Sequence, residues 1–247
     1  VTAERGYFSG NLRGFVRNNT KADADKAFAS YVADEYQGSY RSFTSSDPHD
    51  LTRPFTLTIE GADVGRGGAQ RGQVWVWLFP SDVLDKLPDS LGGGDADVAA
   101  QVAGRKVDYV WSYPHTYEIT NRIELPPGFA PPELPAAETR TLGTMTLTTT
   151  RARVATGYTV TYRLDTGKAR ISADELRAGR AAVAKLRDEG ATQVLATLDA
   201  AQLAQQGKVR EAIAEYRRLI ALHPKEALHH DQLALLYLSV GQGDAAR

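Results

Sequence analysis

Short hydrophobic runs with a two-residue period fill the first two-thirds of the chain. Phe55, Leu57 and Ile59 alternate with threonine and glutamate, and residues 117–125 continue such an alternation. Residues 145–149 and 158–164 repeat the pattern, and turn-forming residues separate the runs. A period of two is typical of a strand that buries one face. The series of such runs predicts an antiparallel sandwich or barrel.

Residues 73–79, with the sequence Q-V-W-V-W-L-F, differ from the other runs because both of their faces are apolar. Trp75 and Trp77 share one face, and two valines and a leucine share the other. A strand of this kind is typical of the middle of a sandwich or of a sheet that a helix covers. We therefore expect both tryptophans to lie in the core.

Two stretches have the helical period instead. Residues 24–35 place apolar side chains on one face, and Gly38 follows just beyond their end. This pattern predicts a helix that covers one face of the sheet. Ser172 and Glu175 have the spacing of a capping box, in which each side chain accepts a hydrogen bond from the other residue's backbone N–H. The helix that begins there is predicted to end at Gly190 and to join the two halves of the chain.

Glycine and proline divide the chain into two unequal parts. Of 33 such residues, 27 precede Ile171 and six lie in the last 77 positions. Because both residues are poor helix formers, the first part is predicted to be rich in strands and the last part helical. We predict an α+β chain of antiparallel β-sandwich or barrel-like modules followed by an α-helical array. Its parts are a β-rich module with one covering helix at 1–104, an antiparallel β module at 105–167, a linker helix at 168–190 and helical repeats at 191–247.

The last part of the chain contains an internal repeat with a period of 34 residues. Residues 193–226 match the following stretch, with small residues at equivalent places and a proline that ends the first unit. The residues expected to pack the repeat are Ala200, Leu203, Gly207, Ala212, Tyr216, Pro224, Ala234, Tyr237, Gly241 and Ala246. A 34-residue period of this kind resembles the tetratricopeptide repeat, whose two helices cross closely at small residues. The chain departs from that pattern at Ala196 and Asp199, where the family carries a large aromatic residue and a leucine.

The second repeat unit is incomplete in this sequence. Each unit leaves a hydrophobic face that a neighbour must cover, and about three units are normally needed for independent stability. We therefore expect one of three arrangements: the native protein continues, the helices dock on the linker helix, or they dock on a second copy of the chain. The resemblance implies that the repeats bind a protein partner.

Composition excludes several functional classes. The chain has 29 basic and 30 acidic side chains, a net charge of -1 and a pI near 6.6. Proteins that bind nucleic acid or anionic membranes carry a basic excess, so we expect neither partner. With no cysteine the chain has no thiolate nucleophile, cysteine–zinc site or iron–sulfur cluster. No stretch approaches the ~20 apolar residues of a membrane span. The absence of cysteine suits the cytoplasm and the cell envelope equally, so the compartment stays open.

The histidines and acidic residues suggest structural roles rather than a metal site. His229 and His230 are adjacent and would point about 100° apart on a helix, unlike an i, i+4 ligand pair. His49 lies between Asp47 and Asp50 in a stretch that contains a proline. A metal or acid–base role is the alternative there, and we favour a turn capped by Asp47. We expect no catalytic residue, cofactor or metal in this chain.

Glycine-rich and polar motifs also have plain structural interpretations. Residues 65–68 contain three glycines but no Walker lysine and no following helix, so a hairpin loop is favoured over a phosphate site. Residues 92–97 lack most of the ligands of a calcium loop and are expected to form a loop. Thr20 is expected to cap a helix rather than to complete a glycosylation motif with Asn18.

One longer stretch resembles a known family. Residues 105–136 contain a hydrophobic run, a proline, the long alternating run and the motif L-P-P-G-F at 125–129. This order resembles the region that follows the catalytic core in bacterial transglutaminase-like proteins, in which β-rich domains flank a papain-like core and tetratricopeptide repeats often follow. Residues 6–14, G-Y-F-S-G-N-L-R-G, resemble the first strand after such a core. The family's Cys-His-Asp triad has no counterpart in this chain, so the resemblance implies a non-catalytic accessory region that supports an absent core.

Two other functions remain open from the sequence. A carbohydrate- or ligand-binding protein, or an enzyme, could use a site at Trp75, Trp77, Asp47 and His49 on the β part, since paired aromatic rings form stacking surfaces. Self-association through the incomplete repeat is the other alternative. The accessibility of the two tryptophans separates the first alternative from the accessory function.

Overall fold

The computed structural model describes residues 2–6, 9–53, 55–70, 73–111, 114–129 and 133–242. Strands and helices are mixed along this part of the chain, and every pair of hydrogen-bonded strands in it is antiparallel. The predicted combination of helices with antiparallel sheets is confirmed at this level. Among the helices of the described ranges, none combines the length and apolar character that crossing a bilayer requires.

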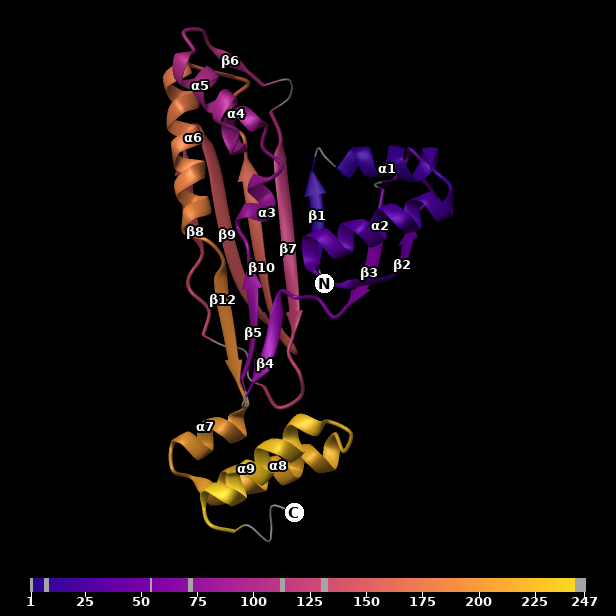
Figure 1. Ribbon diagram of the computed structural model, residues 1–247, viewed down its shortest axis with the longest axis vertical. Coiled ribbons are helices and arrows are strands. Elements are labelled where there is room, and N and C mark those ends of the chain that lie inside the picture. The colour runs from indigo at the N-terminus through magenta and orange to yellow at the C-terminus, as the bar shows by residue number, and fades with distance from the viewer. Residues whose placement is uncertain are drawn as a thin grey trace.

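A five-stranded sheet forms the centre of the molecule (Figure 1). Its order is β1 (Thr2–Gly6), β7 (Thr116–Glu124), β10 (Gly157–Asp165), β9 (Met145–Val154) and β8 (Glu138–Leu142). The three long strands are the alternating runs of the sequence. Tyr117, Met145 and Val160 lie on their buried face. Threonine, glutamate and arginine occupy the opposite face, where Thr120 bonds Thr161 at 3.0 Å. Alternation therefore decides which face of this sheet is covered.

Helices cover one half of that buried face and a smaller sheet covers the other half (Figure 1). The helices are α3 (Ser81–Leu84), α4 (Asp89–Gly92), α5 (Ala96–Gly104) and α6 (Ala173–Asp188). The smaller sheet has the order β12 (Thr192–Thr197), β5 (Gln73–Leu78) and β4 (Gly67–Gln70). A two-stranded sheet of β6 (Tyr109–Val110) and β11 (Arg170–Ile171) lies at the far end. Leu78, Leu84 and Leu176 from these layers share one core with the central strands.

The capping box predicted for the long helix is present. Glu175 N donates to Ser172 Oγ at 3.1 Å, and Ser172 N donates to the Glu175 carboxylate at 2.8 Å. Helix α6 then packs closely on the β8–β9 turn, because Gly143 has a φ of +67° and lies against Gly179 of the helix. A side chain at Gly143 would meet the helix backbone at 2.8 Å.

The N-terminal residues form a small unit beside the central sheet (Figure 1). It consists of α1 (Ser9–Asn18), α2 (Lys21–Tyr36), β2 (Ser39–Ser45) and β3 (Leu57–Ala62). Thr20 caps α2, as predicted, because Asp23 N donates to its hydroxyl at 3.2 Å. Phe28 of α2 packs between Phe15 and Phe43. Helix α2 therefore covers β2, which agrees with the predicted covering helix.

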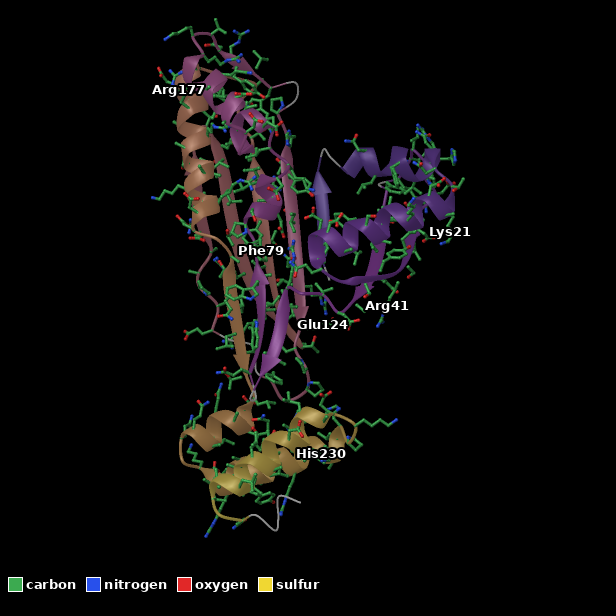
Figure 2. The ribbon with its side chains drawn as sticks, in the orientation of Figure 1. Lys21, Arg41, Phe79, Glu124, Arg177 and His230 are labelled. Atoms are coloured by element: carbon green, nitrogen blue, oxygen red, sulfur yellow. The ribbon has the colours of Figure 1, made fainter. Side chains whose placement is uncertain are left out.

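Arg66 connects this unit to the central layers. Its guanidinium lies over the rings of Tyr36 and Phe79 at 4.5 and 5.1 Å and forms an ion pair with Asp82 of α3. Figure 2 places Phe79 in the central layers, whereas Lys21 and Arg41 lie on the outer side of the N-terminal unit. One arginine thus joins α2 to the segment that contains Phe79 and α3, which is distant from it in the sequence.

The C-terminal helices are α7 (Asp199–Gln205), α8 (Val209–Leu222) and α9 (Ala227–Ser239). They form a separate layer below the sheets, called here the helical array (Figure 1). Residues 192–197 were expected to open the first repeat unit but form strand β12 instead. Val194 and Ala196 pack inward, and the strand pairs with β5 along its whole length. The open edge of β5 supplies backbone partners that override the repeat pattern.

Strand pairs also cross the boundaries drawn from the sequence. β1 and β5, both from 1–104, pair with β7 and β12, which come from 105–167 and 191–247. The 1–104 part therefore shares one sheet with the 105–167 part and another with the 191–247 part. The stretch 6–14 that resembled a first strand corresponds only in part, because β1 ends at Gly6 and α1 begins at Ser9, and its Tyr7 and Phe8 lie outside the described residues.

Candidate functional site

The repeat residues lie where the two helices of the first unit cross. Ala200 and Ala212 are fully buried, and Tyr216 is 2% exposed beside them. Leu203 packs in the same core. Gly207 has a φ of +75° in the turn between α7 and α8, which explains the need for glycine there. Ala200 and Ala212 thus lie in the core shared by α7 and α8, where their small side chains allow a close approach.

The second set of repeat residues lies on and after α9. Tyr237 is 4% exposed, Ala234 is half-buried, and Gly241 has a φ of +75° just beyond the helix. Pro224 lies in the turn between α8 and α9, where its carbonyl is 3.1 Å from Nε2 of His230. The remaining predicted residue, Ala246, lies outside the described residues.

Several leucines of the helical array face solvent. Leu235 and Leu238 on α9 are 53% and 58% exposed, and Leu222 at the end of α8 is 59% exposed. The shift of 34 residues makes Leu235 and Leu238 equivalent to Ala201 and Ala204 of α7, which pack in the core of the array. Leu235 and Leu238 define the apolar surface of α9. This surface is uncovered, whereas the equivalent residues of α7 are packed in the core.

The L-P-P-G-F motif holds the array against the sheets. Phe129 is 8% exposed and bridges to Leu198, and Asp199 N donates to the carbonyl oxygen of Gly128 at 3.2 Å. Gly128 has a φ of +84° and lies against the side chain of Leu219 on α8. The motif is thus a docking loop, and its glycine is required by both backbone conformation and space.

His229 is the one histidine of the array that is fully buried. Neither ring nitrogen has a hydrogen-bond partner within the described residues, and the ring of His223 lies 6.5 Å away. Burial lowers the pKa of His229, Glu226 opposes this, and His223 and His230 add to it. The expected packing role fits this environment. Within the described residues, no group of three or more histidines or carboxylates is placed to hold a metal ion.

The buried imidazole predicts a stability loss in acid. An unfolded-state histidine titrates near 6.5, and the folded state binds its proton less well. The contribution of neutral His229 to the free energy of unfolding is therefore complete above pH 6.5. It is lost as the pH falls from 6.5 through the lower folded-state pKa. We expect a lower unfolding temperature at pH 5 than at pH 7.5 by circular dichroism, and a smaller difference for His229→Gln. His49→Gln, at an exposed site, should leave the difference unchanged; equal differences for all three proteins would contradict the role of His229.

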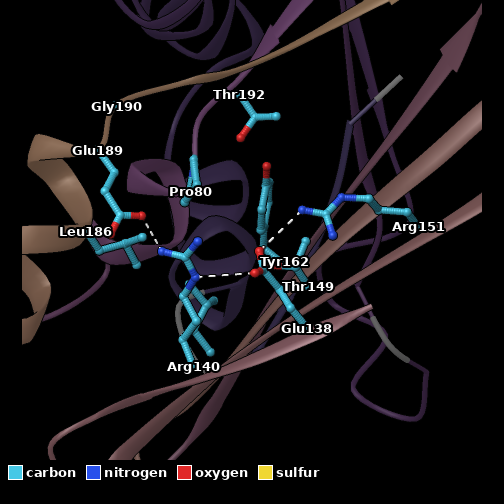
Figure 3. Close-up of a pocket in the computed structure, with 11 residues that line it drawn as sticks. Pro80, Glu138, Arg140, Thr149, Arg151, Tyr162, Leu186, Glu189, Gly190 and Thr192 are labelled. Atoms are coloured by element: carbon cyan, nitrogen blue, oxygen red, sulfur yellow. Dashed lines mark hydrogen bonds and ion pairs between the residues drawn. The ribbon is translucent and has the colours of Figure 1, made fainter. Parts of the chain in front are cut away.

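A polar cavity of about 110 Å³ lies between the central sheet and the end of α6 (Figure 3). Its floor contains Tyr162, 2% exposed, and the side chain of Arg151, 10% exposed. At its rim Arg140 pairs with Glu189 and, at 3.5 Å, with Glu138. Arg151 also reaches Glu138, at 3.4 Å. These residues define the polar cavity.

The sequence interpretation missed this cavity, although one signal was present. Arg151 is in phase with Met145, Leu147 and Thr149, which all face the core from β9. An unpaired charged side chain on the buried face of a strand costs free energy of desolvation. The position of Arg151 in the alternation of β9 therefore marks it as unusual. Burial raises the pKa of Tyr162 to about 12. Its hydroxyl is therefore protonated and can donate a hydrogen bond.

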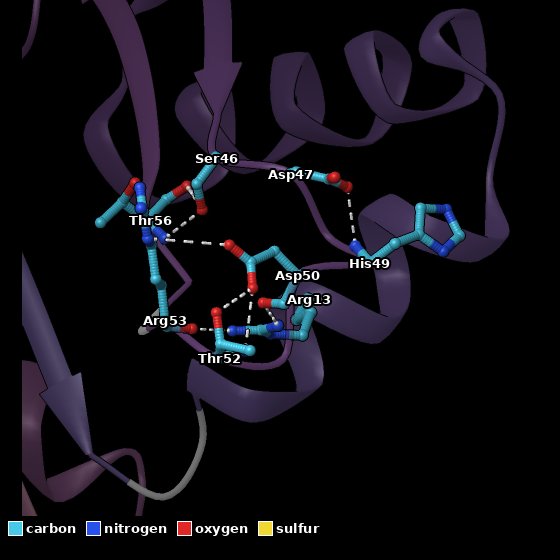
Figure 4. A network of polar contacts seen from close by, with 8 residues as sticks. All are labelled: Arg13, Ser46, Asp47, His49, Asp50, Thr52, Arg53 and Thr56. Atoms are coloured by element: carbon cyan, nitrogen blue, oxygen red, sulfur yellow. Dashed lines mark hydrogen bonds and ion pairs between the residues drawn. The ribbon is translucent and has the colours of Figure 1, made fainter.

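The loop around His49 is a set of turns rather than a site (Figure 4). His49 N donates to the Asp47 carboxylate at 2.8 Å, and Thr52 N donates to the Asp50 carboxylate at 2.9 Å. The guanidinium of Arg13 on α1 bonds the carbonyl oxygens of Asp50 and Arg53. The turn favoured from the sequence is present, and the side chain of His49 is exposed.

The tryptophan strand has one buried face and one outer face. Val76 and Leu78 pack in the core, whereas Trp77 is 37% exposed and Leu195, opposite Trp75 on β12, is 41% exposed. The expectation that both faces lie in the core is therefore wrong for the outer face. The outer side of this three-stranded sheet is uncovered, because no layer of the described residues lies beyond it (Figure 1).

The alternative site at Trp75, Trp77, Asp47 and His49 is not assembled. The two tryptophans lie on β5, and the two loop residues lie beside α1 in the N-terminal unit (Figures 1 and 4). The glycine-rich stretches have structural roles. The predicted loop at 65–68 is only partly a loop, because Gly67 and Gly68 lie in β4 and pair with β5. The predicted loop at 92–97 is confined to residues 93–95, which connect α4 to α5, and Asp95 caps α5.

Comparison of this chain with protein-family models, curated proteins and solved structures found no match. Function is accordingly inferred from the chain's own residues.

Proposed function

We propose that this chain is the non-catalytic accessory region of a bacterial transglutaminase-like protein, and that its helical array binds an amphipathic helix of a partner protein. The order of its parts supports the family assignment: a β-rich part, the L-P-P-G-F motif, a long helix and then repeats. In this proposal the β layers support the catalytic core of the parent protein, and the array is of the tetratricopeptide type.

The observation that carries the binding function is the exposure of Leu235 and Leu238. Their equivalents in the first unit, Ala201 and Ala204, pack in a core to which α8 contributes Ala212, Tyr216 and Leu219. A helix that occupies the same place beside α9 would cover both leucines. Burial of apolar area at ~25 cal/mol per Å² favours such an occupant, and helix-in-groove binding uses apolar residues at this spacing.

The partner helix is expected to lie antiparallel to α9, as α8 lies against α7. Its contacting residues are small or apolar, because the half-buried Ala234 leaves room for a close approach next to the two leucines. Among the described residues, charged groups near this surface are few: His230 and Asp231 lie at the start of α9, and Arg217 of α8 lies over the ring of Tyr237 at 5.9 Å. Apolar contact rather than charge pairing would therefore dominate the affinity.

A peptide with the sequence of α8, residues 208–223, is the natural probe. We expect the fluorescently labelled peptide to bind the full chain saturably in an anisotropy titration, and the Leu235→Glu/Leu238→Glu variant to bind it at least about tenfold more weakly. Leu51→Glu, the same change at a leucine that is 75% exposed in the N-terminal unit, should bind like the unchanged chain.

Two outcomes would contradict this proposal. One is an absence of saturable binding, or equal binding by all three proteins. The other is a rise in molar mass with protein concentration, measured by light scattering, that the double substitution abolishes. That result would identify a second copy of the chain as the occupant of the α9 surface.

A further inference from the structure

We propose that the polar cavity binds a small zwitterion with one carboxylate and one ammonium group, of the size of glycine or alanine. This site is independent of the helical array and of the function proposed for it. Its elements are the ends of α6 and β12 and the inner faces of β8, β9 and β10.

The volume of the cavity limits the ligand. A water molecule takes up about 30 Å³ in the liquid, so about 110 Å³ holds three or four waters or a molecule of about four to six non-hydrogen atoms. A sugar, nucleotide or peptide would extend beyond this volume into solvent. A single α-amino acid with a small side chain fits.

The floor of the cavity is suited to a carboxylate. Arg151 is nine-tenths buried, and its guanidinium makes one hydrogen bond of 2.9 Å, to the carbonyl oxygen of Ala136, and one longer contact of 3.4 Å, to Glu138. Tyr162 lines the same space, and Figure 3 shows its hydroxyl directed toward Thr192. The guanidinium of Arg151 and the hydroxyl of Tyr162 both line the cavity, and both can donate hydrogen bonds to a carboxylate.

The rim is suited to an ammonium group. Glu138 and Glu189 are 41% and 44% exposed there, and each also pairs with Arg140. Helix α6 ends beside the rim at Asp188, so the negative end of its dipole lies next to Glu189. Thr192 at the start of β12 adds a hydroxyl oxygen that can accept a hydrogen bond.

Charge balance selects a zwitterion over a simple ion. The two arginines and two glutamates of the lining sum to zero. A net ion bound among them would remain uncompensated in a partly buried site, which is costly. A ligand that carries both charges adds no net charge to the site. Its carboxylate suits the donors of the floor, and its ammonium group suits the carboxylates of the rim.

The test is ligand-detected NMR of glycine with the full chain, compared with acetate, methylammonium and glycinamide. We expect glycine to bind, and each of the three analogues, which lacks one charge, to bind at least about tenfold more weakly. Equal binding of acetate and glycine would overturn the proposal in favour of a carboxylate site. No detectable binding of glycine would overturn it in favour of a water-filled cavity.

Two tyrosine substitutions supply the protein side of the test. Tyr162→Phe removes one donor from the cavity and keeps the buried ring, so we expect nearly unchanged thermal stability and about tenfold weaker glycine binding. Tyr158→Phe is the matched control, because Tyr158 is equally buried on the same strand but lines a separate apolar cavity. If both substitutions weaken binding equally, or if neither does, the assignment of Tyr162 to the ligand is wrong.

Discussion

Replacement of Gly157 by alanine is expected to lower the free energy of unfolding by about 3–4 kcal/mol. Gly157 is the first residue of β10 and lies opposite Glu124 on β7. A Cβ at this position would lie 2.0 Å from the carbonyl oxygen of Ile123 and 3.2 Å from the Cα of Glu124. Both atoms belong to the backbone of β7, which pairs with β10 along this stretch, so no side-chain rotation can relieve the contact.

The strands must therefore separate at this end of the sheet. The measurement is urea unfolding followed by far-UV circular dichroism. Gly14→Ala is the matched control, because Gly14 lies inside α1 and a Cβ there meets nothing within 4 Å. Since alanine is the better helix former, that variant should be unchanged or up to ~1 kcal/mol more stable. A Gly157→Ala protein with the urea midpoint of the unchanged chain would refute the β7–β10 contact.

Replacement of Gly128 by alanine is expected to cost about 2–4 kcal/mol and to act mainly on the helical array. The backbone φ of +84° is strained for alanine. The new Cβ would also lie 2.7 Å from both methyl groups of Leu219 and 3.2 Å from a methyl group of Leu198. These leucines are buried between the docking loop and the array, so the loop would have to move away from α8.

Gly207→Ala separates the effect of backbone strain from the effect of the contacts with Leu219 and Leu198. Gly207 has a similar φ of +75°, but a Cβ there meets nothing within 4 Å, so only the backbone strain of about 1 kcal/mol applies. Hydrogen exchange monitored in α8 should be faster in Gly128→Ala than in Gly207→Ala at equal pH and temperature. Equal exchange rates in the two variants would contradict the contact between the L-P-P-G-F loop and the array.

The described structure agrees with the sequence where a pattern is local. Ser172 and Glu175 meet across one helical turn, Thr20 caps α2, and Ala200 and Ala212 are buried where two helices cross. In each case the interacting residues lie close together in the chain or share one face of one element. Their geometry follows from the helix itself and needs no distant partner.

The disagreements involve partners that are far apart in the sequence. Residues 192–197 form a strand because β5, more than 110 positions earlier, offers an open edge. Trp77 is part-exposed because a strand with two apolar faces received a cover on only one of them. The polar cavity needs Arg140, Arg151, Tyr162 and Glu189 from four elements, so no spacing in the sequence encodes it.

The sequence by itself determined which residues are strands with a buried face, where two helices begin, and the small residues at which the repeat helices cross. Only the tertiary structure decided that β12 joins β5, that α9 presents Leu235 and Leu238 uncovered, and that a buried arginine and tyrosine share one cavity. The physical reason is that periodicity reports which side of an element is apolar, whereas the choice of what covers that side depends on long-range packing.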